Sequence, residues 1–214
     1  MKQYKLLLVT ILMFFMTGCS SAEDQLLEQF PDYNEIIESL SSDKQKQLSS
    51  IAKENKDYTF EEVYEQNFYD ENSDFLSFVI QDKAKNLQSL LKENTNIELK
   101  FPQLINDGEQ LWSASYDVYV DGTKTDGNVR LVWNNSTNSY AGATVFFGEN
   151  GSFTDNELLC KYVIMTGTDP FDNISESRAD SIVRWCRNYN SYTVSSDFDI
   201  YIMNQNLFVF PYKF

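Results

Sequence analysis

Hydrophobic and polar positions follow two different periods along the chain, and the period changes near Asn96. Over residues 73–93 apolar residues recur at three- and four-residue steps, which places them on one stripe of an α-helix. They are Phe75, Leu76, Val79, Ile80, Ala84, Leu87, Leu90 and Leu91. The charged residues fall mostly off that stripe: Asp82, Lys83, Lys85 and Lys92. The pattern predicts a long amphipathic helix with one face in a core.

Capping signals predict further helices before this one. Ser42 with Gln45, and Thr59 with Glu62, have the spacing of a capping box, in which two side chains bond each other's backbone N–H groups. Each pair precedes a helix-compatible segment.

From Asn96 the apolar residues alternate with a period of two, which is typical of strands with one buried face. The segments between these runs contain turn-forming residues: Asn106-Asp107-Gly108, Asp121-Gly122, Asp126-Gly127 and the polar stretch 134–139. We expect an antiparallel meander of three or four strands, whose apolar face is covered by the preceding helix. The alternating positions are Ile97, Leu99, Phe101, Trp112, Ala114, Tyr116, Val118, Val120, Val129, Leu131, Trp133, Ala141, Ala143, Val145 and Phe147.

The last third of the chain returns to helical spacing and then alternates again. Thr154 with Glu157 forms a third capping pattern, and Gly167 is placed to end that helix. A second helix is expected from Glu176, with its apolar face formed by Ala179, Ile182, Val183 and Cys186. The chain is predicted to close with a hairpin. Its apolar residues alternate over 198–202, a polar turn follows at 204–206, and a second strand ends before Pro211.

These elements predict an α+β fold with N-terminal helices, an antiparallel β-meander, a helix pair and a C-terminal β-hairpin. We assign residues 32–214 to a single domain and 19–31 to a tether, because Pro31 stops the short helical turn before it. A two-lobed arrangement dividing near 148–151 is the alternative.

The start of the chain carries an export signal. Lys2 and Lys5 precede an apolar run over Leu6–Phe15, which is shorter than the roughly 20 residues that span a bilayer. Met16-Thr17-Gly18-Cys19 follows and resembles the lipobox of bacterial lipoproteins, with Met16 where that family usually has Leu. The resemblance implies that residues 1–18 are a signal peptide and that Cys19 is acylated. The acyl chains would hold the protein at the extracytoplasmic face of the cell membrane.

Charge narrows the class of partner. The chain has 32 acidic and 17 basic residues and a net charge of −15. This excludes nucleic acid, whose phosphates require Lys and Arg, and disfavours anionic lipids and wall polymers. Basic proteins and neutral glycans are the easier partners; solubility alone is the other explanation of the acidity.

The chain contains no histidine, which removes Ser-His-Asp and Cys-His catalysis and His-ligated zinc. Ser50 and Lys53 match the S-x-x-K of penicillin-recognising enzymes, but the companion motifs are missing, so we interpret them as helix surface. The acidic segments 70–74 and 121–127 do not match a calcium-binding loop, so we predict no metal site and no cofactor.

Two cysteines remain once Cys19 is assigned to lipid. Cys160 and Cys186 are not in a C-x-x-C motif, and both fall on the apolar faces of the two predicted helices. In an oxidising compartment they are a natural disulfide pair; two buried free thiols are the alternative.

Aromatic residues supply a candidate contact. Trp112 and Trp133 share the apolar faces of their strands and are expected in the core. Tyr119 lies on the opposite face from Trp112 and is therefore the candidate for an exposed contact. The segment Asp197–Tyr212 resembles the last hairpin of an extracytoplasmic domain found in lysozyme-sensing anti-sigma factors and some polysaccharide deacetylases, which implies a hairpin there.

Three functional hypotheses follow. The first is a membrane-anchored binding or envelope-structural module without catalytic activity. The second, within that class, is an inhibitor or sensor of a basic envelope-directed protein such as a lysozyme. The third is a hydrolase that cleaves cell-wall glycan with two carboxylates, since acidic side chains are the one plentiful catalytic group.

Overall fold

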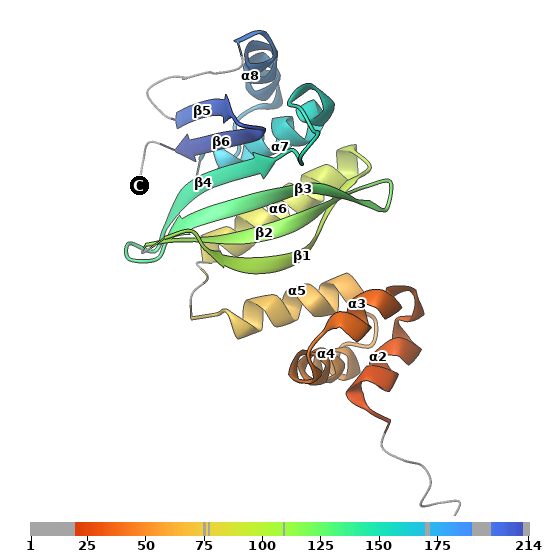
Figure 1. The fold of residues 1–214 in the computed structure, drawn as a ribbon. Coiled ribbons are helices and arrows are strands. Elements are labelled where there is room, and N and C mark those ends of the chain that lie inside the picture. Colours follow the sequence, from red (N-terminus) through yellow and green to blue (C-terminus); the bar gives the residue numbers. More distant parts are fainter. Residues whose placement is uncertain are drawn as a thin grey trace, which may run out of the picture. The chain divides into compact units, whose positions relative to one another are not determined.

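The computed structural model describes residues 20–74, 76, 78–108, 110–169, 172–189 and 198–211. The chain divides into two compact units after Asn67, which lies within helix α5 (Phe60–Glu71). Each unit is described by itself (Figure 1), and the single domain expected over 32–214 stays a prediction. Cys19 and its lipobox lie outside the described residues. Within the described ranges, no helix has the length and apolarity needed to cross a membrane.

The first unit is helical and begins before the point expected from the sequence. Ser21 and Asp24 bond each other's backbone N–H groups at 3.0 Å and so start α2. Leu26 of this helix is 1% exposed, so the segment expected to be a tether contributes to a core. The helices are α2 (Ala22–Gln29), η1 (Pro31–Tyr33), α3 (Asn34–Ser39), α4 (Ser42–Glu54) and the first part of α5.

Aromatic rings fill the centre of the first unit. Phe60 is fully buried, and its ring centroid lies 5.4 Å from that of Phe30 and 4.7 Å from that of Tyr33. The capping box of Thr59 and Glu62 is confirmed by reciprocal bonds of 2.7 and 3.3 Å. The capping box expected from Ser42 and Gln45 is wrong: the N-cap of α4 is Ser41, whose hydroxyl accepts from the backbone N–H of Lys44, and the Gln45 side chain donates to the carbonyl of Ile37.

The second unit contains a six-stranded antiparallel sheet in the order β1-β2-β3-β4-β6-β5. The predicted meander and the closing hairpin therefore belong to one sheet, because β6 pairs with β4 (Figure 1). The α+β class is confirmed. The strands are β1 (Ile97–Asn106), β2 (Leu111–Val120), β3 (Thr123–Asn134), β4 (Ser139–Phe146), β5 (Phe198–Met203) and β6 (Asn206–Pro211).

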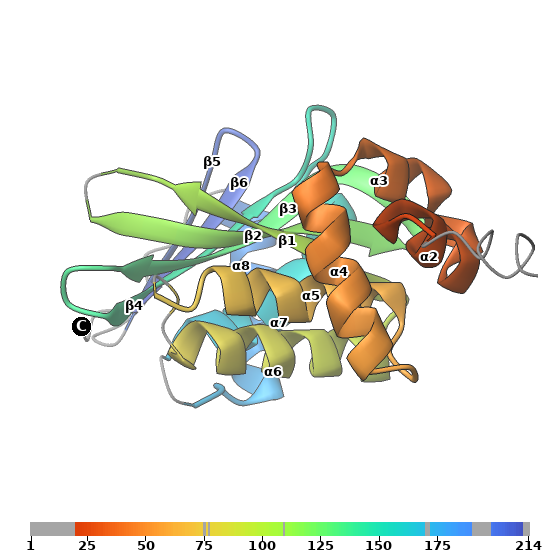
Figure 2. The same cartoon turned by 90° about the horizontal axis from the view of Figure 1, so that it is seen from below.

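Helices cover one face of this sheet. α6 (Phe78–Asn94) packs on β1, β3 and β4, α7 (Glu157–Gly167) packs on β4 and β6, and α8 (Glu176–Tyr189) packs on α7 (Figures 1 and 2). The core between the sheet and the helices includes Tyr116, Leu131 and Trp133, all at most 1% exposed. The predicted cover of the meander by an amphipathic helix is confirmed.

One charged residue of α6 lies where the sequence pattern did not place it. Lys83 is only 4% exposed, although its spacing put it off the apolar stripe. Its ammonium donates to the backbone carbonyl of Asp172 at 3.2 Å and lies 6.0 Å from the ring centroid of Tyr140. Burial lowers the pKa of Lys83 to about 8, against the opposing influence of Asp169 and Asp172. The backbone at Asp172 therefore lies over this side chain.

Strand β1 also departs from simple alternation. Phe101 has a φ of +52° and precedes Pro102, and the pairing register with β2 shifts between Lys100 and Gln103. The bulge lies at Phe101, which is 6% exposed, and its ring meets that of Tyr119 edge-on at 6.0 Å.

Two further predictions, the capping box of Thr154 with Glu157 and the turn at Asp126-Gly127, differ from the structure. Ser152 and Asp155 bond each other ahead of α7, whereas the side chain of Glu157 pairs with Arg187. Asp126-Gly127, expected as a turn, lies inside β3.

Candidate functional site

The face of the sheet opposite α6 and α7 carries a row of half-buried aromatic side chains. On β6, Leu207 and Val209 are buried in the core, so the alternate residues Phe208 and Phe210 project to the other face. Tyr201 on β5 joins them: its ring lies 4.8 Å from that of Phe208, and the two rings are nearly parallel. Phe208 and Phe210 are 6.1 Å apart and inclined by 18°. We call Tyr201, Phe208 and Phe210 the aromatic row.

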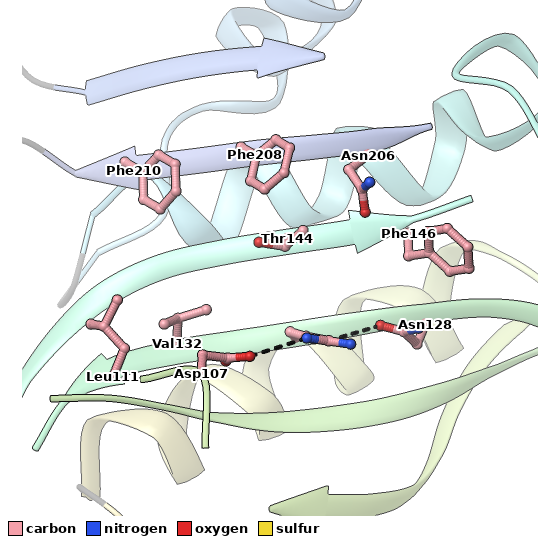
Figure 3. A pocket seen from close by; sticks show the side chains of 10 residues that line it. Asp107, Leu111, Asn128, Val132, Thr144, Phe146, Asn206, Phe208 and Phe210 are labelled. Atoms are coloured by element: carbon pink, nitrogen blue, oxygen red, sulfur yellow. Dashed lines mark hydrogen bonds and ion pairs between the residues drawn. The ribbon is translucent and has the colours of Figure 1, made fainter. Parts of the chain in front are cut away.

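A groove of about 500 Å³ runs beside the aromatic row across β3, β4 and β6 (Figure 3). Its apolar lining comes from Leu111, Val132, Phe146, Phe208 and Phe210. Its polar lining comes from Asp107, Asn128, Arg130, Thr144 and Asn206. Since strands of one sheet supply most of these side chains, their spacing is fixed by the strand pairing.

Gly142 allows β4 and β6 to approach closely beside the groove. Its φ is +133°, and a Cβ atom there would lie 2.2 Å from the carbonyl oxygen of Val209 and 3.0 Å from Phe210 Cδ1. No side chain fits in that space, so a residue other than glycine would push β6 and Phe210 away.

The polar side of the groove is held by a chain of hydrogen bonds. Arg130 donates from Nη1 to Asp107 at 3.2 Å and from Nε to Asn128 at 3.3 Å (Figure 3). Asp107 also accepts from the hydroxyl of Ser113 at 2.6 Å. A guanidinium has five N–H groups and these bonds occupy two, which leaves donors for a ligand. The single cation and the single anion among the lining residues pair with each other, so this surface is locally neutral.

The candidates from the sequence lie elsewhere. Cys160 and Cys186 are buried on α7 and α8 as free thiols, so the structure has no bond between them. Ser50 and Lys53 are exposed on α4, as interpreted. Tyr119 is half-buried on the same face as the groove but lies beside Lys100, whose ammonium is 5.2 Å from its ring.

The two tryptophans follow the prediction. Trp133 is fully buried, and Trp112 packs against the core while remaining partly exposed.

Sequence reasoning missed the groove, although a signal for it was present. The run over 207–210 is apolar at every position, so the strand has two hydrophobic faces. Because the described helices α6 and α7 pack on the opposite face of the sheet, Phe208 and Phe210 belong to a surface of the second unit rather than to its core. Asp107 was assigned to a turn, and only the fold brings it to Arg130.

The lining of the groove offers a single carboxylate. Glycoside hydrolysis needs two carboxyl groups about 5–10 Å apart. Asp107 is the one carboxylate among the ten lining residues, and both of its oxygens already accept hydrogen bonds. In the part of the chain that the structure describes, no group of three or more Cys, Asp or Glu side chains is arranged to hold a metal ion.

Comparisons of the chain with protein-family models, with curated proteins and with solved structures find no match.

Proposed function

We propose that the protein is a membrane-anchored, extracytoplasmic binding module without catalytic activity, and that the groove on the sheet of the second unit is its binding site. One observation carries the proposal. In a single groove, Phe208 and Phe210 of the aromatic row lie beside Asp107, Asn128 and Arg130, whose side chains are held by hydrogen bonds and whose charges balance. Binding sites of this kind combine apolar lining with a few polar groups that fix orientation. The location rests on the lipobox resemblance at Cys19.

A neutral glycan is the ligand class that the groove fits best. A sugar ring has an apolar C–H face, which can stack on Phe208 and Phe210 of the aromatic row. It also has a rim of hydroxyl groups, which can form hydrogen bonds with the Asp107, Asn128 and Arg130 side chains. The net charge of −15 disfavours anionic ligands, and the Arg130–Asp107 pair leaves no unbalanced charge among the lining residues for a cation to neutralise.

The first unit supports a second candidate, a basic protein partner. Residues 20–67 contain twelve acidic and four basic side chains, a far higher density of negative charge than in the rest of the chain. Such a surface attracts cationic proteins over a range set by ionic strength. An inhibitor or sensor of a lysozyme-like protein remains in keeping with this unit.

Calorimetric titration with neutral tetrasaccharides tests the groove. The protein, extracted from the membrane fraction in mild detergent, is titrated with chitotetraose, cellotetraose and maltotetraose. We expect one of them to bind, and expect Phe208→Ala and Arg130→Ala each to weaken it about tenfold, the equivalent of about 1.4 kcal/mol. Trp185→Ala is the matched control, because Trp185 is an aromatic residue of the same unit, 50% exposed on α8 and outside the groove.

Two results would count against this assignment. Binding that survives both groove variants would place the glycan site elsewhere. Absence of binding by all three sugars, together with salt-sensitive binding of lysozyme, would favour the acidic first unit as the functional surface.

A further inference from the structure

Helices α7 and α8 form an antiparallel pair whose register is fixed by ion pairs. Near one end, the Arg187 guanidinium of α8 donates through Nε and Nη2 to the two carboxylate oxygens of Glu157 on α7. One turn further along α7, the Lys161 ammonium lies 2.7 Å from Glu176 and 2.9 Å from Asp180, both in the first turns of α8. The start of α7 therefore lies beside the end of α8.

This register brings the two cysteines into the same stretch of the helix pair. Cys160 follows Glu157 by one helical turn on α7, and Cys186 directly precedes Arg187 on α8. Both thiols are 0% exposed and belong to one core cluster. Burial raises the pKa of the Cys160 thiol well above its ordinary value, and the neighbouring Cys186 thiol raises it further. The packing of α7 on α8 and the place of both residues in that one cluster put the cysteines on the facing sides of the two helices.

We propose that Cys160 and Cys186 form an intramolecular disulfide that ties α7 to α8 in the exported protein. The bond requires an oxidising compartment, so its presence in the cell rests on the export implied by the lipobox resemblance. It forms by thiol–disulfide exchange with a low-molecular-weight or enzyme disulfide. The two protein thiols lose two protons and two electrons, one S–S bond forms, and the oxidant is reduced to two thiols.

The bond forms while the helices are docking, not afterwards. Once folded, both thiols are closed to solvent, and burial raises the pKa of Cys186 to about 11, so neither supplies a reactive thiolate near neutral pH. α7 packs directly behind β4 and β6, the strands that carry Thr144, Phe208 and Phe210. The disulfide therefore fixes the layer that supports the groove.

Peptide mapping after oxidative refolding tests the pair. The full-length protein carrying Cys19→Ser, which leaves only these two cysteines, is reduced, unfolded and refolded in detergent with oxidised and reduced glutathione. Free thiols are then alkylated and the protein is digested with trypsin without reduction. We expect peptide 131–161 joined to peptide 185–187, because trypsin cleaves after Arg130, Lys161, Arg184 and Arg187. Cys160→Ser in the same background must give no joined peptide.

The proposal is wrong if the refolded protein, native by circular dichroism, carries two alkylated or two glutathionylated cysteines. The wild-type protein taken directly from the cell envelope provides a second test that needs no refolding: it must give the same joined peptide. Recovery of alkylated Cys160 and Cys186 from envelope protein that external protease can reach would also overturn the pairing.

Discussion

The two units of the chain differ in how they present a surface to partners. The first, residues 20–67, is built of short helices around a few aromatic rings and carries twelve acidic against four basic side chains. The second, residues 68–214, has twenty acidic and eleven basic side chains in three times the length, and its candidate site is an aromatic groove with a paired Arg and Asp. Charge thus distinguishes the first unit, and shape with local neutrality distinguishes the second.

Because the two units have separate cores, we expect each to have its own free energy of unfolding. The variant with the largest expected effect tests this. Phe60 is fully buried in the first unit, so Phe60→Ala is expected to cost that unit about 3–5 kcal/mol. Urea unfolding followed by circular dichroism should show one early transition in the variant, with the transition of the sheet unit unchanged. A single transition shifted as a whole would show that the two units unfold together and would break the comparison.

The disulfide is expected to stabilise only the second unit, because both cysteines lie in α7 and α8. Closing a loop of about 26 residues lowers the entropy of the unfolded chain by an amount worth roughly 3.5 kcal/mol. Urea midpoints of the oxidised and reduced protein provide the measurement. Equal stabilisation of the helical unit would contradict the assignment of the bond to the α7–α8 pair.

Lys83 gives the second unit a distinctive dependence on pH. Its pKa is lowered from 10.5 to about 8 by burial, so between these values the unfolded chain binds more protons than the folded one. The free energy of unfolding should therefore rise with pH across this window, by an amount on the order of 3 kcal/mol if the whole shift is realised.

The variant Lys83→Met separates this rise from the titration of other groups. It removes the buried amine and should flatten the rise in the sheet unit measured between pH 8 and 10.5. A slope that is the same in the wild type and in Lys83→Met would show that the ammonium is hydrated in the folded state.

The sequence pattern predicted local elements better than it predicted their assembly. Alternation identified the core positions of β2 and β3, including Tyr116, Leu131 and Trp133, because one face of each strand is buried. It could not show that β6 pairs with β4, since strand order depends on contacts between distant segments. The same limit hid the groove, in which Asp107 and Arg130 meet only through the pairing of three strands.

Side-chain exceptions had a different cause. Lys83 is buried because a loop from a remote part of the chain supplies the carbonyl of Asp172 to its ammonium. Phe101 stays buried, at 6% exposure, but its ring packs on Tyr119, because the bulge before Gln103 interrupts the alternation of β1. A sequence period predicts which side chains are buried only when the helix or strand is regular and packs against a single neighbouring layer. Lys83 is covered by a second segment, and Phe101 lies at a bulge, so the period does not describe their surroundings.

The smallest expected effect concerns the charge of the first unit. Glu28, Glu35 and Glu38 are exposed, and replacing all three by Gln should weaken binding of lysozyme at low salt, each charge contributing less than about 1 kcal/mol. A matched set in the second unit, Asp82→Asn, Glu93→Gln and Asp121→Asn, removes the same charge from exposed positions.

Surface plasmon resonance at 20 and 150 mM salt distinguishes local from overall charge. If the density of charge on the first unit matters, its triple variant loses more affinity than the matched set, and the difference shrinks as salt screens exposed charges beyond about 8 Å. Equal losses would mean that lysozyme responds only to net charge. The contrast between the units would then rest on the groove alone. Ligand binding there is expected to depend less on ionic strength, because it uses the aromatic row and an Arg130 side chain whose charge is paired with Asp107.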